Sequence, residues 1–107
     1  MGIQAWSEDT ILVDLSGEPE MGNELVKVAE IMCDRGDCDV VIDFSGVDIV
    51  TSSSLSKLLN LRKKLFNVGH KLVLCSVSAA TQGIFMITGL ESNFEFVNDK
   101  SEVLTSL

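Results

Sequence analysis

Apolar residues recur at every second position near the start of the chain. In residues 10–16 (TILVDLS), Ile11, Val13 and Leu15 follow this two-residue period. Successive side chains of a strand point to opposite faces, and the pattern therefore predicts a strand with one buried face. Residues 3–6 are expected to supply an antiparallel partner for this strand.

Further along, the apolar spacing changes to three and four residues, which is typical of amphipathic helices. Leu25, Val28, Ala29 and Met32 show this spacing within residues 23–34. Three more helices are expected: from the hydroxyl-rich stretch at 51–54 to about residue 68, from a cap at Ser78 to Thr88, and after a cap at Asp99.

The second of these helices has a leucine-rich apolar arc. Its expected members are Leu55, Leu58, Leu59, Leu65 and Phe66. Arg62 falls within this arc by angle, and its stem is expected to cover the core while its charged head reaches solvent.

Three short apolar runs separate the predicted helices: residues 39–44 (DVVIDF), 71–77 (KLVLCSV) and 94–97 (FEFV). The first has the composition of a central parallel strand that is buried on both faces. Strands that alternate with helices imply right-handed crossovers and a mostly parallel sheet. The sequence therefore predicts a single α/β domain over residues 1–107. We expect a mixed, mostly parallel sheet of about four or five strands, with about four helices packed against it.

The composition is that of an ordinary globular protein with an acidic balance. Of 107 residues, 46% are hydrophobic and 22% are charged, and the net charge is −8. This charge argues against nucleic acid and against an anionic membrane surface as partners, because both are bound by basic faces. No run approaches 18 consecutive apolar residues, and the N-terminus does not resemble a signal peptide. We therefore expect no membrane insertion and a cytoplasmic location.

Residue patterns for metal and redox chemistry are weak. The three cysteines, Cys33, Cys38 and Cys75, are an odd number and lack CxxC spacing, which favours a reducing compartment. The aspartates lack metal-ligand spacing, and no glycine-rich phosphate-binding motif occurs. We therefore expect no metal and no cofactor.

Residues 49–59 (IVTSSSLSKLL) contain four consecutive hydroxyl side chains, Thr51–Ser54, between a predicted strand and a predicted helix. The loop after a parallel strand opens at the carboxyl edge of the sheet, where functional sites collect. At a helix start, free backbone N–H groups and the positive end of the helix dipole favour a negative group. The run is thus a candidate site for an anion or a partner.

The residues alone leave three interpretations of this run. Thr51 or Ser52 can cap the helix. One serine can accept a phosphoryl group, which would add negative charge without unfolding the helix and would repel a docked partner. A catalytic serine needs a base, and the only histidine, His70, is expected at the opposite edge of the sheet. We therefore expect the protein to have no catalytic activity.

Residues 40–59 (VVIDFSGVDIVTSSSLSKLL) combine an apolar strand, a D-x-S-x-V motif, the hydroxyl run and a leucine-rich helix. Residues 77–99 contain Thr88-Gly89-Leu90 followed by Phe94, and residues 12–18 read LVDLSGE. Together these segments resemble the STAS domain family of sulphate transporters and anti-sigma factor antagonists. The resemblance covers nearly the whole chain and implies the α/β fold of that family.

The resemblance also implies an anti-sigma factor antagonist. Stand-alone bacterial members bind an anti-sigma factor while unphosphorylated, which frees the sigma factor. The anti-sigma factor is often a serine kinase that ends the association by phosphorylating a loop serine. That serine corresponds to Ser53, with Ser52, Ser54 and Thr51 as less favoured alternatives. We expect the partner to contact Glu20, Thr51, Ser52, Ser53, Ser54, Ser56 and Lys57. The residues favour no particular oligomeric state.

The chain departs from the family pattern around this loop. Thr51 and Ser54 stand where the pattern has Asp and Gly, and Pro19-Glu20 stands where Leu-Asp is usual. Glycine leaves room for a partner's backbone, whereas serine adds a side chain. A second interpretation therefore stays open: a non-phosphorylated scaffold or accessory subunit, similar to stressosome components or to subunits of lipid-transport ABC systems.

Overall fold

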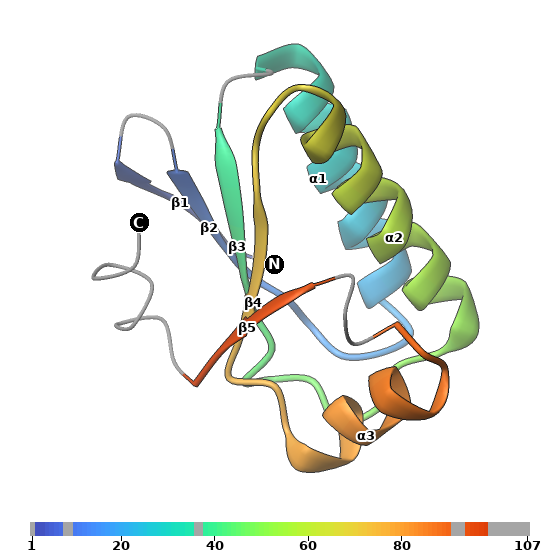
Figure 1. Cartoon of the computed structure of the whole chain (residues 1–107). Coiled ribbons are helices and arrows are strands. Elements are labelled where there is room, and N and C mark those ends of the chain that lie inside the picture. The colour runs from blue at the N-terminus through green and yellow to red at the C-terminus, as the bar shows by residue number, and fades with distance from the viewer. Residues whose placement is uncertain (1, 8–9, 36–37, 91–93, 99–107) are drawn as a thin grey trace.

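The computed structural model describes residues 2–7, 10–35, 38–90 and 94–98 (Figure 1). Its elements are β1 (Gly2–Ser7), β2 (Thr10–Asp14), α1 (Met21–Arg35), β3 (Asp39–Asp43), α2 (Ser52–Asn67), β4 (Leu72–Cys75), α3 (Ala79–Ile87) and β5 (Glu95–Val97). The helix expected after Asp99 lies outside the described residues. None of the helices in the described ranges has the length and apolar character to span a lipid bilayer.

The five strands form one mixed sheet in the order β1-β2-β3-β4-β5. β1 pairs antiparallel with β2, and each later pair is parallel, with Val13 opposite Ile42 and Ile42 opposite Leu74. β3 lies in the middle of the sheet, where Val40, Val41 and Ile42 are fully buried. The predicted α/β fold, with its antiparallel first pair and its central strand at 39–44, is confirmed.

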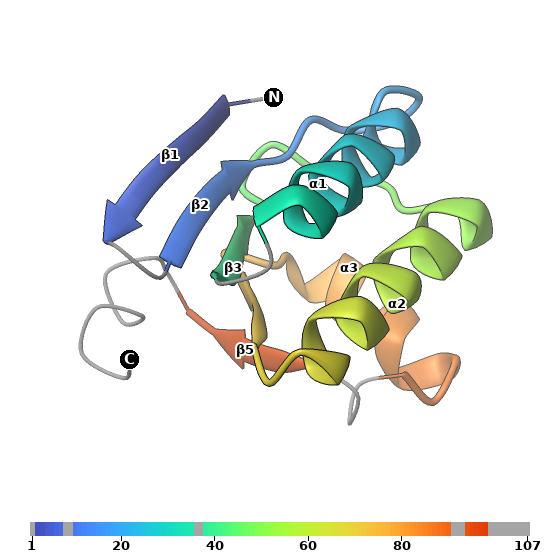
Figure 2. The same ribbon diagram turned by 90° about the horizontal axis from the view of Figure 1, so that it is seen from above.

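Helices α1 and α2 lie side by side over one face of the sheet, and α3 lies near the carboxyl edge (Figures 1 and 2). The main apolar core fills the space between helices and sheet, and includes Val13, Leu25, Ile42, Leu58 and Leu74. A smaller buried cluster occupies the alternate positions of the strands, which point to the other face, and comprises Leu12, Val41, Val73 and Cys75.

The buried stripe of α2 is centred differently from the sequence prediction. Leu58 and Leu65 are buried as expected, but Leu61 is buried too, whereas Phe66 is 69% exposed. The prediction that Phe66 belongs to the core is therefore wrong. The physical reason is that α2 packs against both α1 and the sheet, which moves the buried stripe toward Leu61. Arg62 is half-buried, and its guanidinium carbon lies 5.7 Å from the centroid of the Phe66 ring.

The β2–α1 and β3–α2 loops emerge at the same edge of the sheet, because β2 and β3 are parallel neighbours. The Leu15 N–H donates to the Asp43 carbonyl oxygen at 3.1 Å, which holds the beginnings of both loops together. Val47 and Val50 are buried and anchor the second loop. The fold thereby brings residues 16–20 close to the hydroxyl run.

Candidate functional site

The hydroxyl run forms the start of α2. Thr51 has an extended backbone (φ −87°, ψ 161°) and is the N-cap, with its Oγ1 accepting a hydrogen bond from the Ser54 N–H at 3.2 Å. Its carbonyl oxygen accepts the first helical bond, from the Leu55 N–H at 3.0 Å. Of the two caps considered from the sequence, the structure selects Thr51. One hydroxyl of the run is thus used for capping, as the physics of helix ends requires.

A carboxylate from the neighbouring loop binds the same helix end. Glu18 Oε2 accepts hydrogen bonds from the Thr51 N–H at 3.0 Å and from the Ser54 hydroxyl at 2.9 Å. The Thr51 hydroxyl in turn donates to Ser54 Oγ at 3.3 Å. Thr51, Ser54 and Glu18 therefore form a closed hydrogen-bond network that joins the two loops.

Glu18 is an anion held at the positive end of a helix. Hydrogen bonding by Thr51 is the main cause that lowers the pKa of Glu18 below its ordinary value, while partial burial acts in the opposite direction. Ser54 and the positive charge of Lys57 also lower this pKa. The site is thus built to hold a negative charge, and the chain itself supplies the first one.

Lys57 lies one helical turn beyond Ser53, next to the start of α1. An added Cβ at Gly22 would lie 2.8 Å from Lys57 Nζ, so the lysine occupies space that only a glycine leaves open. A shallow pocket of about 260 Å³ is formed here, lined by Glu18, Pro19, Gly22, Asn23, Thr51, Ser53, Ser54 and Lys57. The pocket brings an exposed hydroxyl, a carboxylate and an ammonium group together.

Comparison with known proteins identifies the family. Residues 3–103 match the family model described as STAS domain. The chain belongs to the STAS domain family. BtrV of Bordetella bronchiseptica, named as an anti-sigma factor antagonist, is 33% identical over 67 residues, which are 63% of this chain and 58% of BtrV. The match spans less than two thirds of the length of that relative.

Solved structures share the fold at low sequence identity. An anti-sigma-factor antagonist (STAS) domain protein from Planctomyces limnophilus has a TM-score of 0.85 at 19% identity, over 98% of this chain and 95% of its own. The Bacillus cell-fate determinant SpoIIAA in its phosphorylated form has a TM-score of 0.74 at 13% identity, over 99% of this chain and 98% of its own. The sheet order and the helix placement are therefore those of the STAS fold.

The three serines of the hydroxyl run have different surroundings. Ser52 and Ser53 are the first two residues of α2, and both are exposed. Ser54 is only 2% exposed and its hydroxyl is bound to Glu18. The serine that replaces the family's glycine thus points inward and adds no side chain to the outer surface. Ser53 is the exposed serine that also lines the pocket.

The other residues expected at the partner surface are spread around this point. Lys57 lines the pocket with Ser53. Ser56 is exposed, and its hydroxyl donates back to the Ser52 carbonyl oxygen at 3.1 Å. Glu20 is exposed and does not line the pocket. The acidic residue that does contact the loop is Glu18, which the residue-by-residue prediction missed although it lies within the LSGE segment.

The described residues offer little for catalysis or metal binding. His70 lies at the amino edge of the sheet, where its Nδ1 is 3.1 Å from Asp39 Oδ1, and β4 separates it from the hydroxyl loop. In the described ranges, no group of three or more His, Cys, Asp or Glu residues is placed to hold a metal ion.

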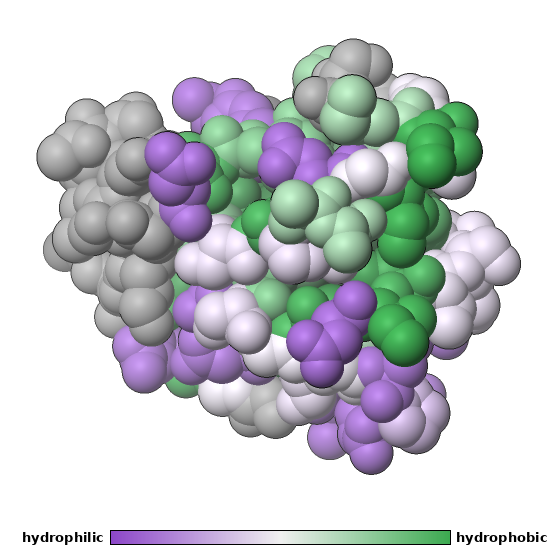
Figure 3. Space-filling model, turned by 90° about the horizontal axis from the view of Figure 1, so that it is seen from below, coloured by the Kyte–Doolittle hydropathy of each residue, from purple (hydrophilic) through white to green (hydrophobic). Residues whose placement is uncertain are grey.

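Apolar side chains are exposed near the same edge of the sheet. The view from below the sheet in Figure 3 shows apolar surface mixed with polar surface around α3. On the β3–α2 loop and on α3, the exposed large apolar residues are Ile49, Met86 and Ile87. The sequence did not predict that these side chains of α3 are exposed. Apolar residues occur on all sides of the predicted helix 78–88, so its periodicity does not define one buried face.

Proposed function

We propose that this protein is a bacterial, cytoplasmic anti-sigma factor antagonist that binds an anti-sigma factor with serine kinase activity and is released when Ser53 is phosphorylated. The observation that carries the proposal is the position of Ser53. Its side chain is exposed in the first turn of α2, and it lines a pocket with Lys57 and Glu18. The chain acts by binding, and its serines are substrates rather than nucleophiles.

The contacts of each hydroxyl favour Ser53 over its neighbours. Thr51 Oγ1 is engaged as the helix cap, and Ser54 is buried against Glu18. A kinase needs its acceptor hydroxyl to be accessible, and accessibility leaves Ser52 and Ser53. Ser53 is also the position that corresponds to the acceptor of the STAS family pattern, which favours Ser53 over Ser52.

A phosphate at Ser53 is compatible with the fold. It would lie at the positive end of α2, where a negative charge stabilises the helix by about 0.3–1 kcal/mol. It would also lie four residues before Lys57, on the same face of the helix. The Glu18 carboxylate nearby opposes this gain, so the net change in the free energy of unfolding is expected to be small. A partner packed over the loop would instead meet a desolvated charge of about −1.5 to −2. The modification therefore acts on the complex and leaves the fold intact.

The test uses the anti-sigma factor recovered by pull-down with the unmodified protein. Incubation of both proteins with ATP, followed by mass spectrometry, is expected to show one phosphate on Ser53, and none on the Ser53→Ala variant. Ser53→Asp is expected to weaken binding more than tenfold, which is about 1.4 kcal/mol, whereas Ser53→Ala keeps the affinity. Asn60→Asp, an exposed change of the same charge on α2, serves as the matched control. Phosphate on another residue, or equal affinities of all variants, would contradict the proposal.

One observation favours a second candidate, a constitutive scaffold or accessory subunit. The helix end already holds the Glu18 carboxylate, and Ser54 binds it where the family pattern has glycine. In a constitutive subunit this network would serve only to fix the loop. The same pair of experiments separates the candidates: a scaffold takes no phosphate from its partner and tolerates Ser53→Asp without loss of affinity.

A further inference from the structure

Positive charge is concentrated in one segment of this acidic chain. Residues 52–71 contain five of the eight Lys and Arg residues and none of the 16 Asp and Glu residues. These residues form α2 and the turn that leads into β4, and the basic ones are Lys57, Arg62, Lys63, Lys64 and Lys71. A segment of charge +5 within a chain of net charge −8 is a marked segregation of charge.

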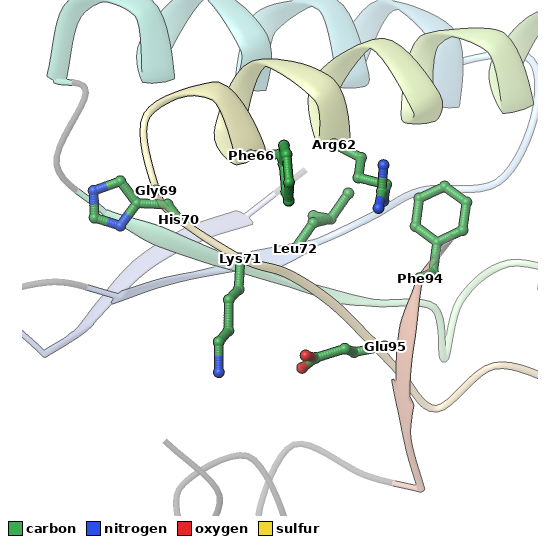
Figure 4. Close-up of a pocket in the computed structure, with 8 residues that line it drawn as sticks. All are labelled: Arg62, Phe66, Gly69, His70, Lys71, Leu72, Phe94 and Glu95. Atoms are coloured by element: carbon green, nitrogen blue, oxygen red, sulfur yellow. The ribbon is translucent and has the colours of Figure 1, made fainter. Parts of the chain in front are cut away.

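A groove of about 600 Å³ lies where α2 ends and β4 begins (Figure 4). It is lined by Arg62, Phe66, Gly69, His70, Lys71, Leu72, Phe94 and Glu95. The groove belongs to the amino edge of the parallel strands, opposite the hydroxyl loop. Phe66 lies thirteen positions after Ser53 on the same helix, a distance of about 20 Å along the axis. The groove is therefore separate from the site proposed above.

The groove and its rim expose apolar surface. Phe66 is 69% exposed and Val68 is 55% exposed, while Leu72 and Phe94 are buried at the base. Figure 4 shows Arg62, Phe66, Leu72 and Phe94 on the helix side of β4, and Lys71 and Glu95 pointing to the other side. Covering an exposed phenylalanine with an apolar partner removes apolar surface from water and so favours association. Such exposure beside a groove is typical of a docking surface.

Two cations, Arg62 and Lys71, line the groove. Among the described residues, no carboxylate forms an ion pair with Arg62 or Lys71. The Asp39 carboxylate is engaged by His70 Nδ1 at 3.1 Å and by the Lys71 N–H at 2.9 Å, which fixes the backbone of the turn without neutralising the Lys71 ammonium. The carboxylate that lines the groove, Glu95, offsets part of this charge. Within the described ranges, the surface thus combines two cations that form no ion pair with an exposed aromatic ring, and the Arg62 guanidinium lies 5.7 Å from the centroid of that ring.

We propose that this groove docks an acidic segment of a protein partner. An aromatic or aliphatic side chain of that segment packs on Phe66, with one flanking carboxylate facing Arg62 on the helix side of β4. A carboxylate on the other flank reaches Lys71 at the amino end of the strand, where that side chain points to the opposite side. The exposed Val68 and Lys63 extend the surface beyond the groove, which suits an extended peptide better than a small molecule. Glu95 and the acidic remainder of the chain disfavour a lipid bilayer or a nucleic acid. Because the groove is remote from Ser53, docking here is independent of phosphorylation.

The proposal is tested by selecting a random peptide library, displayed on phage, against the full-length protein. The selected peptides are expected to carry Asp or Glu on both sides of an aromatic or aliphatic residue. Synthetic versions of these peptides are expected to bind at least tenfold more weakly to Lys71→Glu and to Phe66→Ser, and with unchanged affinity to Lys27→Glu, an exposed lysine change on α1. Both altered side chains are exposed, and circular dichroism checks that the variants remain folded.

Three results would overturn the proposal. The first is a selection without an acidic consensus, or peptides that bind Lys71→Glu as tightly as the unaltered protein. The second is a dimer in sedimentation that Lys71→Glu dissociates, which would assign the surface to a second copy of the chain. The third is co-sedimentation with phosphatidylserine vesicles that Lys71→Glu abolishes, which would assign the surface to a membrane.

Discussion

The network around Glu18 gives the sharpest test of the site's architecture. Glu18→Ala removes the acceptor of two hydrogen bonds, from the Thr51 N–H and the Ser54 hydroxyl. Water can replace the acceptor for the exposed Thr51, but Ser54 is only 2% exposed. A charged acceptor contributes about 1.5–3 kcal/mol per bond, and the partial exposure of Glu18 reduces this. We expect the free energy of unfolding to fall by about 2 kcal/mol.

Urea denaturation followed by far-UV circular dichroism at pH 7 measures this loss. The matched control is Glu20→Ala, two residues away and exposed, for which a change below about 0.5 kcal/mol is expected. Glu18→Gln keeps an oxygen acceptor and removes only the charge, so its cost is expected to be intermediate, about 1 kcal/mol. Equal stabilities of Glu18→Ala and Glu20→Ala would refute the view that Glu18 joins the two loops.

The charge of Glu18 also sets a pH dependence. Its pKa in the folded protein lies below the ordinary value of 4.5, so the ionised group stabilises the fold fully above about pH 4.5. This contribution is lost as the pH falls through the lowered folded-state pKa. At pH 7 the unaltered protein is therefore expected to have a higher free energy of unfolding than Glu18→Gln. In strong acid, where Glu18 is protonated, this difference is expected to vanish. A difference that grows toward low pH would contradict this sign.

Three further changes test other parts of the fold by the same urea titration. Phe85→Ala is expected to cost about 3–5 kcal/mol, because Phe85 is fully buried and packs edge-to-face on Phe94 with ring centroids 5.4 Å apart; a loss below about 1 kcal/mol would show that this cluster is not a packed core. Gly69→Ala is expected to cost about 1–2 kcal/mol, because Gly69 has φ +80°. Gly83→Ala, in the middle of α3 where an added Cβ meets no atom, is expected to stabilise the fold by about 0.5–1 kcal/mol. A change of the same sign in the free energy of unfolding for both variants would refute the assigned backbone conformations. Ser54→Gly, which restores the residue of the family pattern, is expected to cost about 1–2 kcal/mol by removing the hydroxyl that bonds Glu18; an unchanged stability would show that this bond contributes nothing.

Local patterns in the sequence predict much of this fold. The two-residue period of β2 and the β-branched run of β3 each identify a strand, because side-chain alternation and burial act within a few residues. The cap of α3 at Ser78 is confirmed in the same way, since Ser78 Oγ accepts a hydrogen bond from the Thr81 N–H at 3.1 Å. Such features depend on neighbours in sequence, and sequence reasoning is therefore sufficient for them.

Features that depend on tertiary neighbours could not be predicted in this way. Helical periodicity places Leu61 and Phe66 at opposite borders of the apolar arc of α2, about 140° apart around the axis. Only the packing of α2 against α1 and the sheet decides that the Leu61 border is buried and the Phe66 border exposed. The bond from the Thr51 N–H to Glu18 joins residues 33 apart in sequence. The buried Ser54 hydroxyl donates to the same carboxylate, which lies 36 residues away in sequence. The prediction of an open hydroxyl run thus omitted the carboxylate that the fold brings to it.

The two ends of α2 have opposite partial charges, and the chain places a complementary charge at each: Glu18 from the β2–α1 loop at the amino end, and Lys64 of α2 itself at the carboxyl end. At the amino end, backbone N–H groups attract an anion, and the Glu18 carboxylate accepts a hydrogen bond from one of them, the Thr51 N–H. The Ser53 hydroxyl stays exposed in the pocket that Lys57 also lines. At the carboxyl end, the negative pole of the helix favours cations, and Lys64 in the last turn stabilises it there. Because these charges are fixed by the helix dipole and by separate loops, a phosphate at one end changes little at the other. Under the two proposals, phosphorylation of Ser53 would therefore release one partner and leave a second bound at the Phe66 groove.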